Sequence, residues 1–399
     1  MLKKLSIRDI DFLGKRVFCR VDFNVPLDEN NQITDDTRVK ASMPTIRHII
    51  NNGGRLILAS HLGRPKNGPE AKFSLASVAP CLSQYLGKPV KMAPDCIGPD
   101  VARMVNQMEN GDVLLLENVR IHAGETKNDP EFAKALSENA DIYVNNAFGT
   151  AHRAHASTEG VTHYLQPAAA GFLLEKEIKY LGQALAYPDH PFVAVIGGAK
   201  VSDKIAVIEN LLDKVDTLII GGGMAYTFLR ATGRPTGQSL VEEDRIELAK
   251  KLLQKAADNG VSLLLPQDHV VASEFSPNAE HKTCSDADFP AGWMALDIGP
   301  ATIATYTEAL RNARMVIWNG PMGVFEMEPF DRGTKAVAVA VATATDNGAR
   351  SIIGGGDSAS AVQKLGLEEK ISHISTGGGA SLEFLEGKKF TCLEILDEK

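Results

Sequence analysis

Short runs of β-branched and aliphatic residues recur along the whole chain, and each is followed by small or polar residues and then by a longer stretch with helical periodicity. Such alternation is typical of βαβ units and parallel sheets. We therefore expect an α/β fold whose mostly parallel β-sheets are covered by helices, in a Rossmann-like arrangement. The pattern predicts strands at Val17–Val21, Leu56–Ala59, Val113–Leu116, Ile142–Asn145, Phe192–Ile196, Thr217–Ile220, Ser262–Leu265, Met315–Trp318, Ser351–Ile353 and His373–Ser375.

A segment with helical spacing lies near the middle of the chain, from Ala168 to Ala186. The whole chain has 399 residues, which exceeds the size at which a single hydrophobic core usually stops growing, so two domains are expected. We interpret residues 168–186 as a helix that joins them. A crossover helix within one domain would show the same pattern, and this alternative stays open.

Cationic and polar residues follow the predicted strands of the first half, where ligands of open parallel sheets usually bind. An arginine side chain presents a planar fork of donors that matches a phosphate or carboxylate group. Any one of them is more often a surface residue, but their recurrence after successive strands favours a site for a small, highly charged anion. The candidates are Arg38, Arg64, Arg120 and Arg153 together with His61.

Glycine-rich turns follow the predicted strands of the second half, at 197–198, 221–223, 354–356 and 377–379. Such turns allow close backbone approach and direct N–H groups and a helix dipole toward a phosphate. A single turn of this kind could be explained simply as a tight connection between a strand and a helix. Their recurrence in one half favours a bound nucleotide.

Two motifs restrict the types of nucleotide-binding site that the sequence allows. The sequence contains no GxxxxGK[ST], which excludes a Walker phosphate loop. Residues 354–359 match the relaxed GxGxxA fingerprint, so a nicotinamide dehydrogenase is the alternative enzyme. That site needs an acidic residue at the end of the next strand, where 374–377 reads ISTG. A non-enzymatic anion-binding protein is the remaining alternative.

Three charged residues are candidates for handling the phosphates. Asp357 follows a glycine triplet and could hold Mg²⁺ on the nucleotide, or it could be the N-cap of a helix. Lys200 and Lys204 are expected one turn apart on a helix, where they could neutralise the transferring group. Otherwise they are exposed lysines.

Composition excludes several classes of protein. A formal net charge of -8 and a pI near 5.7 argue against a nucleic-acid binder. The N-terminus has no secretory pattern and no apolar stretch is long enough to span a membrane. The five cysteines have no metal-ligand spacing and are interpreted as reduced thiols of a cytosolic protein. His152 and His155 lack nearby ligands for zinc and are expected in a phosphate contact or a hydrogen-bonded loop.

Ten stretches of the chain, in order, closely resemble the phosphoglycerate kinase family. They are RVDFNVP (20–26), DDTR (35–38), SHLGRP (60–65), LLLENVR (114–120), NNAFGTAHRAH (145–155), GGAKVSDK (197–204), GGGMAYTFL (221–229), NGPMGVFE (319–326), IIGGGDSA (352–359) and STGGGAS (375–381). The resemblance implies reversible phosphoryl transfer from 1,3-bisphosphoglycerate to MgADP, giving 3-phosphoglycerate and MgATP in glycolysis. It also implies a cytoplasmic monomer that binds neither nucleic acid nor membrane.

The resemblance also assigns regions and residues. The implied regions are a phosphoglycerate-binding domain at 1–170, an interdomain helix at 171–186, a nucleotide-binding domain at 187–388, and a tail at 389–399 that returns to the first domain. The implied substrate-binding residues are Asp22, Phe23, Asn24, Arg38, His61, Leu62, Gly63, Arg64, Arg120 and Arg153. The implied nucleotide-binding residues are Gly198, Lys204, Gly222, Pro321, Glu326 (on the ribose), Gly355, Gly356, Asp357 (toward Mg²⁺) and Ser358. Arg38, Lys200 and Gly378 are the implied catalytic residues.

The sequence departs from the family at three places. Ser358 stands where threonine is common, Met327 replaces a common tryptophan, and the tail lacks the usual Leu-Pro-Gly. The mechanism that we expect needs no general base, because in the ATP-consuming direction the acceptor is a carboxylate that is ionised at neutral pH, with a pKa of ~4. Positioning, charge stabilisation and hinge closure around residues 168–186 would then carry in-line transfer.

Overall fold

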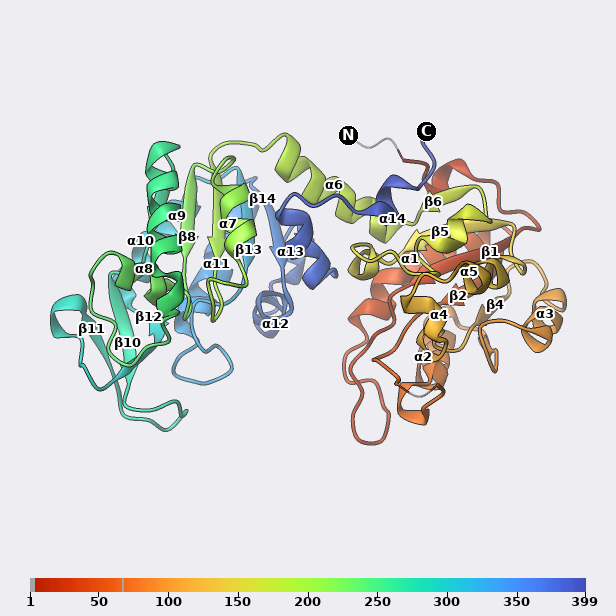
Figure 1. Cartoon of the computed structure of the whole chain (residues 1–399), viewed down its shortest axis with the longest axis horizontal. Helices are drawn as coiled ribbons and strands as arrows, with labels where there is room; N and C mark the ends of the chain where they lie inside the picture. Colours follow the sequence, from red (N-terminus) through yellow and green to blue (C-terminus); the bar gives the residue numbers. More distant parts are fainter. Residues whose placement is uncertain (1–3, 67) are drawn as a thin grey trace. The chain divides into compact units, whose positions relative to one another are not determined.

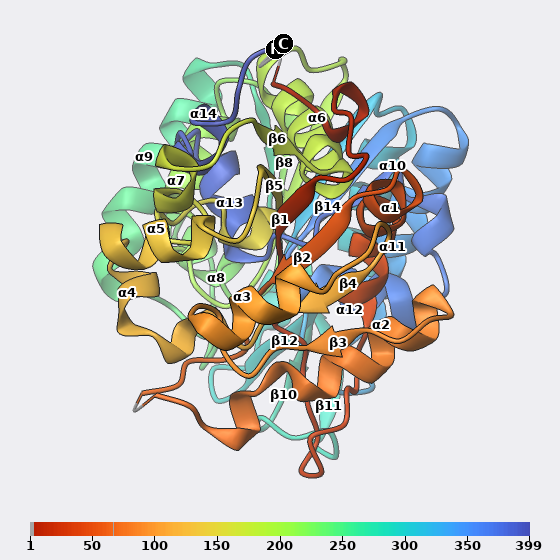
Figure 2. The same cartoon turned by 90° about the vertical axis from the view of Figure 1, so that its right-hand side faces the viewer.

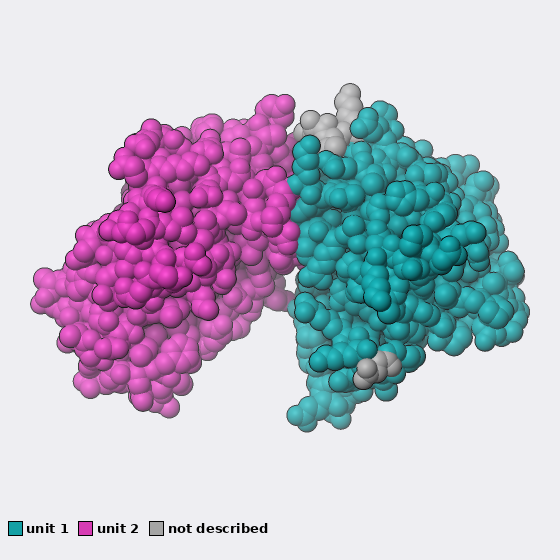
Figure 3. Space-filling model, in the orientation of Figure 1, with its two compact units in different colours: residues 1–179, 389–399 teal, residues 180–388 magenta. Residues whose placement is uncertain are grey.

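The computed structural model describes residues 4–66 and 68–399, which fold into two compact units (Figure 3). Unit 1 comprises Met1–Lys179 and Lys389–Lys399, and unit 2 comprises Tyr180–Lys388. The division lies within α6 (Phe172–Ala186), so this helix contributes residues to both units. Within the described ranges, no helix is both long and apolar enough to cross a membrane.

Unit 1 contains a six-stranded sheet in the order β3-β4-β2-β1-β5-β6, with every pair parallel. Figure 2 faces this unit and shows β1 between β2 and β5. The strands are β1 (Arg16–Val21), β2 (Arg55–Ala59), β3 (Lys91–Met92), β4 (Val113–Leu115), β5 (Ile142–Asn146) and β6 (Ala168–Ala170). The helices are α1 (Thr37–Asn51), α2 (Val78–Leu86), α3 (Pro99–Asn106), α4 (Ala123–Thr126), α5 (Pro130–Ser137) and α14 (Thr391–Glu394).

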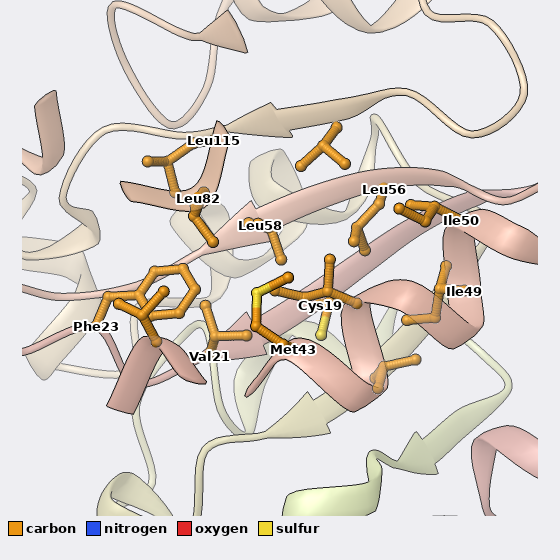
Figure 4. Close-up of a cluster of buried hydrophobic side chains, with 14 of the residues drawn as sticks. Cys19, Val21, Phe23, Met43, Ile49, Ile50, Leu56, Leu58, Leu82 and Leu115 are labelled. Atoms are coloured by element: carbon orange, nitrogen blue, oxygen red, sulfur yellow. The ribbon is translucent and has the colours of Figure 1, made fainter. Parts of the chain in front are cut away.

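The core of unit 1 forms where one face of this sheet packs on helices. Cys19 of β1 and Leu58 of β2 meet Met43 and Ile49 of α1 in one buried cluster (Figure 4). Full burial of an aliphatic side chain contributes about 1.5–3 kcal/mol, so this face supplies much of the stability of the unit. The rigid sheet fixes the loops that leave its strands.

Unit 2 contains a second parallel six-stranded sheet, in the order β15-β14-β13-β7-β8-β9, and α9 and α11 pack along its strands (Figure 1). Its strands are β7 (Phe192–Ile196), β8 (Thr217–Ile220), β9 (Ser262–Leu264), β13 (Met315–Asn319), β14 (Arg350–Gly354) and β15 (His373–Ile374). Its helices are α7 (Ile205–Leu211), α8 (Ala225–Ala231), α9 (Ile246–Asp258), α10 (Pro300–Arg311), α11 (Arg332–Asp346), α12 (Gly356–Lys364) and α13 (Gly379–Leu385). The predicted α/β class with mostly parallel sheets is confirmed.

The sequence did not predict the small antiparallel sheet of unit 2. It comprises β10 (Asp268–Ala272), β11 (His281–Ser285) and β12 (Met294–Ile298) in the order β11-β10-β12. Four of the five residues of β11 are exposed, so the strand lacks the apolar run that marks a buried parallel strand. The two-residue β3 is too short to give a periodic signal.

The start of the predicted central helix is wrong. Ala168–Ala170 form β6, which pairs with β5, and the helix begins at Phe172. Alanine has the highest helix propensity, but here the backbone completes a sheet, because Tyr143 pairs with Ala168 and Asn145 with Ala170. Tertiary pairing has overridden local preference.

The C-terminal tail packs within unit 1. The Leu5 N–H donates to the Asp397 carbonyl at 2.7 Å, and the Asp397 carboxylate accepts from the Ala168 N–H at 2.8 Å. The Phe390 ring lies 6.0 Å from that of Phe148. The tail therefore completes the edge of the sheet at β6.

Candidate active site

Three of the predicted arginines line one cavity of unit 1, with a volume of about 590 Å³, which we call the arginine cavity. Its wall includes Arg64, Lys66, Arg120, His122, Arg153 and His155. These residues follow β2, β4 and β5, three strands whose carboxyl ends lie at the same edge of the parallel sheet. The structure therefore brings three of the predicted strand-end arginines together, namely Arg64, Arg120 and Arg153.

Arg120 is held in an unfavourable electrostatic position. Burial and the neighbouring charges of Arg20 and Arg153 lower its pKa to about 10, yet it is still charged at neutral pH. Its Nη1 donates to the Gly63 carbonyl at 2.8 Å, which fixes the side chain. An anion in the cavity would offset the repulsion among these guanidinium groups. The cavity is therefore suited to a multiply charged anion.

Three further predicted residues, Asp22, Arg38 and His61, interact electrostatically with one another. Arg38, in the first turn of α1, forms an ion pair with Asp22. Burial would raise the pKa of Asp22, but the neighbouring guanidinium groups of Arg38 and Arg20 lower it below its usual value, so the carboxylate is ionised. Burial and the same arginines keep the pKa of His61 well below 6.5, so its imidazole is neutral at neutral pH. Positive charge here therefore comes from arginine.

The loops that carry these residues are tied together by hydrogen bonds. Asn24 accepts from the Gly63 N–H at 2.8 Å, which joins the loops after β1 and β2. The side chains of Phe23 and Leu62 lie in the hydrophobic core, so only their backbone atoms can face a ligand. Asn118 accepts from the Arg120 N–H at 3.0 Å and thereby positions that arginine.

A buried polar chain behind this site was not predicted. Arg20 is fully buried in β1, and its Nε donates to Ser157 Oγ at 2.7 Å. Ser157 in turn donates to the buried Glu125 at 2.6 Å, while Arg20 Nη2 lies 3.3 Å from His61 Nδ1. An arginine inside an otherwise apolar strand, RVFCRV, was the available sequence signal.

His155 has no role as a cation here. Burial and the nearby Arg120, Arg20 and Arg153 lower its pKa to about 4, so it is neutral at neutral pH. His155 lies in the wall of the arginine cavity. The ring of His152 is tilted against that of Phe390, with centroids 6.2 Å apart. Among the described residues, neither histidine belongs to a cluster of three potential metal ligands.

In unit 2 the glycine turns fall into two kinds. After β7, β8 and β13 they pack on one another: Gly222 has φ +69° and a Cβ there would lie 2.5 Å from the Gly198 carbonyl oxygen. Gly198 itself donates to the Pro321 carbonyl at 3.1 Å. Close packing alone therefore requires glycine at 222.

The turns before α12 and α13 are open instead. A Cβ on Gly356, Gly378 or Gly379 would meet no heavy atom within 4 Å. Gly355 and Gly378 are the N-caps of α12 and α13, and neither helix has a side-chain cap. The first turn of α12 thus offers uncapped N–H groups to an anion, while in α13 the Ala380 N–H already donates to the Gly377 carbonyl at 3.0 Å.

Asp357 is exposed in the first turn of α12, and the N-cap is Gly355. The alternative that Asp357 caps this helix is therefore wrong. The neighbouring Ser358 is buried, and its Oγ accepts from the Gly320 N–H at 2.7 Å. Ser358 thereby joins α12 to the loop after β13, which contains Pro321 and the exposed Glu326.

The expectation that Lys200 and Lys204 share a helix is also wrong. Residues 198–204 form a loop, and Lys204 is the N-cap of α7. The loop is held by Glu242, which accepts from the Ser202 hydroxyl at 2.6 Å. Lys200 is exposed.

Lys204 points to the end of β13, where its Nζ donates to Asn319 Oδ1. Burial lowers the pKa of Lys204 to about 8, although the carboxylates of Asp203 and Asp357 oppose this shift. Asn319 is 1% exposed, and its Nδ2 has no hydrogen-bond partner among the residues that the structure describes. An unsatisfied buried donor beside Gly355 is a further feature suited to an acceptor-rich ligand.

Known proteins match the chain over almost its whole length. The family model described as phosphoglycerate kinase matches residues 7–388. The chain is 57% identical over 396 residues to phosphoglycerate kinase of Chlorobium chlorochromatii, covering 99% of this chain and 100% of that protein. It is 56% identical over 397 residues to that of Gloeothece citriformis, covering 100% and 98%.

Solved structures agree with this match. Phosphoglycerate kinase from Coxiella burnetii superposes with a TM-score of 0.89 at 45% identity, covering 98% of each chain. The enzyme from Pyrococcus horikoshii OT3 gives a TM-score of 0.86 at 35% identity, again covering 98% of each chain.

Proposed function

The chain belongs to the phosphoglycerate kinase family, and we propose which of its residues carry out the reaction of that family. It is a kinase of glycolysis that reversibly transfers a phosphoryl group between 1,3-bisphosphoglycerate and ADP, giving 3-phosphoglycerate and ATP. The expected activity is thereby confirmed, and the dehydrogenase and non-enzymatic alternatives are set aside. Monomeric state and cytoplasmic location stay predictions.

The phosphoglycerate is proposed to bind in unit 1, and the convergence of three arginines on one cavity is the observation that carries this assignment. Arg64, Arg120 and Arg153 would hold its phosphate and carboxylate groups. Asp22, Asn24 and His61 would orient it, together with the backbone of Phe23, Leu62 and Gly63.

The nucleotide is proposed to bind in unit 2. The open positions at Gly356 and Gly378, together with Gly355 at the N-cap of α12, would present helix N-termini to its phosphates. Lys204 would contact the phosphates, Glu326 the ribose, and Gly198, Gly222, Pro321 and Ser358 would shape the surrounding loops.

Mg²⁺ is proposed to reach the nucleotide through Asp357. The residue fits this role, because an exposed carboxylate beside an unobstructed turn offers the hard oxygen ligand that Mg²⁺ prefers. When bound, the ion would offset charge on the phosphates. Lys204 would contact the same phosphates, and the charge of Asp357 already opposes the lowering of the pKa of its amine by burial.

Transfer itself is proposed to rely on charge and position. In the ATP-consuming direction the acceptor is the carboxylate of 3-phosphoglycerate, which is ionised at neutral pH with a pKa of ~4, so no proton needs to be removed. Arg38, Lys200 and the start of α13 at Gly378 would offset the charge of the transferring group. Arg38 is already oriented by its ion pair with Asp22.

A coupled assay of ATP formation from 1,3-bisphosphoglycerate and MgADP tests the assignment as a whole. Activity is expected, together with thermal stabilisation by MgADP and none by NAD. Because the two anions are assigned to separate units, closure about α6 and its flanks is part of the proposal. Small-angle scattering should show compaction when both substrates are present; unchanged dimensions would contradict closure.

A further inference from the structure

A third cluster of side chains in unit 1 plays no part in the mechanism above. Asp95 and Cys96 follow β3, and His122 follows the short helix η4 (Val119–Ile121). One potential ligand atom from each of these three residues lies within 4.8 Å of the others. His122 Nε2 is 2.5 Å from Asp95 Oδ1, and the Cys96 thiol donates to the Glu117 carbonyl at 2.9 Å. The fold thus brings together two segments that are distant in sequence.

These three groups form a recognised type of ligand set. Thiolate, imidazole and carboxylate are the groups that bind Zn²⁺ in proteins, at bond lengths of ~2.0–2.3 Å. Tetrahedral bonds of this length place donor atoms roughly 3–4 Å apart. The ligand atoms of the cluster lie within 4.8 Å of one another, so binding requires the side chains to rotate until their spacing matches that range. From this convergence we propose that Asp95, Cys96 and His122 form a binding site for a thiophilic divalent cation such as Zn²⁺.

The electrostatic surroundings favour a cation. Cys96 is 2% exposed, and burial together with the charges of Asp95, Glu125 and Glu117 raises the pKa of its thiol well above 9. The thiol is therefore protonated when no cation is bound. The same carboxylates that disfavour a thiolate create a negative potential that attracts a dication.

Binding releases one proton from the thiol. The Cys96 S–H bond breaks, the sulfur forms a bond to the cation, and the proton passes to solvent. In the metal-free protein His122 Nε2 carries the proton that it donates to the Asp95 carboxylate. Binding through Nε2 therefore breaks this N–H bond, and the imidazole takes up a proton from solvent on Nδ1, so the ring stays neutral. No oxidant or reductant is involved, so the step is a simple exchange of a proton for a metal ion.

The cluster is both held in place and accessible. The His122 ring stacks on Phe132 with centroids 4.8 Å apart, and the Cys96 N–H donates to Asp95 Oδ1 at 2.6 Å. The side chains of His122 and Asp95 are 28% and 42% exposed, which leaves a path from solvent to the buried sulfur. Water would complete the coordination from that side. Because His122 also lines the arginine cavity, the cation would lie next to the proposed anion site.

Cobalt provides a direct probe of thiolate ligation. Metal-free full-length protein is titrated with Co²⁺ and then with Zn²⁺, and absorption is followed in the near ultraviolet. One equivalent of Co²⁺ is expected to give a thiolate-to-cobalt charge-transfer band, which Zn²⁺ then removes. Cys96→Ser is expected to abolish the band, and His122→Asn to weaken Co²⁺ binding by about tenfold or more.

Matched variants separate this site from other metal binding. Cys81→Ser removes the half-buried thiol in the same unit, and His163→Asn removes a histidine that pairs with Glu159 at 2.7 Å, outside the proposed ligand set. Both should retain the band. If circular dichroism shows that Cys96→Ser does not fold, the test rests on whether His122→Asn weakens Co²⁺ binding. Absence of a band in the unmodified protein, or its persistence in Cys96→Ser, would overturn the proposal and leave the assigned kinase activity untouched.

Discussion

Unit 1 and unit 2 offer two different ways of holding an anion. In unit 1 the charge resides on side chains, with Arg64, Arg120 and Arg153 around one cavity. In unit 2 the donors are mainly backbone N–H groups at open glycine turns such as Gly356 and Gly378. A site built from side chains should lose function when one charged side chain is removed. A site built from backbone groups should lose function when a glycine is replaced and the new Cβ obstructs the ligand or strains the turn.

The largest effect is expected for Arg38→Ala, which should lower kcat by about 10³-fold and raise KM much less. The arginine would interact most strongly with charge that develops in the transition state, and Asp22 would be left without its ion pair. Steady-state kinetics with varied 3-phosphoglycerate and MgATP measure both constants. Arg47→Ala is the control, because this exposed arginine on the same helix donates to the Tyr85 carbonyl and has no proposed role at the site. A raised KM with unchanged kcat would make Arg38 a binding residue.

Gly222→Ala should reduce the free energy of unfolding by about 2–3 kcal/mol. Its φ of +69° is unfavourable for alanine, and the new Cβ would lie 2.5 Å from a carbonyl oxygen. Gly356→Ala is the matched comparison, because no atom lies within 4 Å of its Cβ position and alanine favours a helix.

Urea unfolding of both variants, paired with MgADP titrations, sharpens this contrast. Gly356→Ala should unfold like the unmodified protein and bind MgADP more weakly, because the added methyl group would face the proposed phosphate position. Equal unfolding energies for the two variants would show that the two kinds of glycine turn do not differ.

Asp357→Ala should weaken the Mg²⁺-dependent part of nucleotide binding by about tenfold, or about 1.4 kcal/mol. The reason is the loss of the proposed oxygen ligand, while the helix N-terminus that faces the phosphates is kept. Calorimetric titration of ADP with and without Mg²⁺ measures the difference. Asp203→Ala is the control, since Asp203 also acts on Lys204 but has no proposed metal role. An unchanged metal dependence would remove Asp357 from the site.

The smallest effect concerns pH. Burial lowers the pKa of Lys204 to about 8, so its amine is positive below that pH and neutral above it. Affinity for MgADP should therefore be highest below pH 8 and fall as pH rises through 8, by at most about tenfold per pH unit for one proton. Lys204→Arg keeps its charge and should give a flat profile between pH 7 and 9. Parallel profiles for the two proteins would show that another group titrates.

The continuous apolar strands were the most predictable part of the fold. The bounds of β7 and β8 agree with the sequence prediction, because strands buried on both faces consist of uninterrupted aliphatic residues. The exposed β11 and the alanine strand β6 carry no such signal. Their strand conformation depends on pairing partners elsewhere in the chain.

The candidate site was predictable to the extent that its residues recur at strand ends. The buried chain from Glu125 through Ser157 to Arg20 was not, because hydrogen bonds between distant segments leave no spacing pattern. The same holds for Cys96, whose sequence context shows no metal-ligand spacing. Its partner His122 lies beside it only because β3 and β4 are neighbours in the sheet.

The sequence by itself determined the parallel α/β architecture, the family, and the division of charge, with arginines after the strands of one half and glycines after those of the other. These features are local, because hydrophobic periodicity and residue type at a strand end act over a few positions. Only the tertiary structure decided which glycines are needed for packing and which face open space. It also decided that Lys204 loses positive charge more readily than a solvated lysine. Both depend on burial by segments distant in sequence, and burial sets desolvation and steric contact.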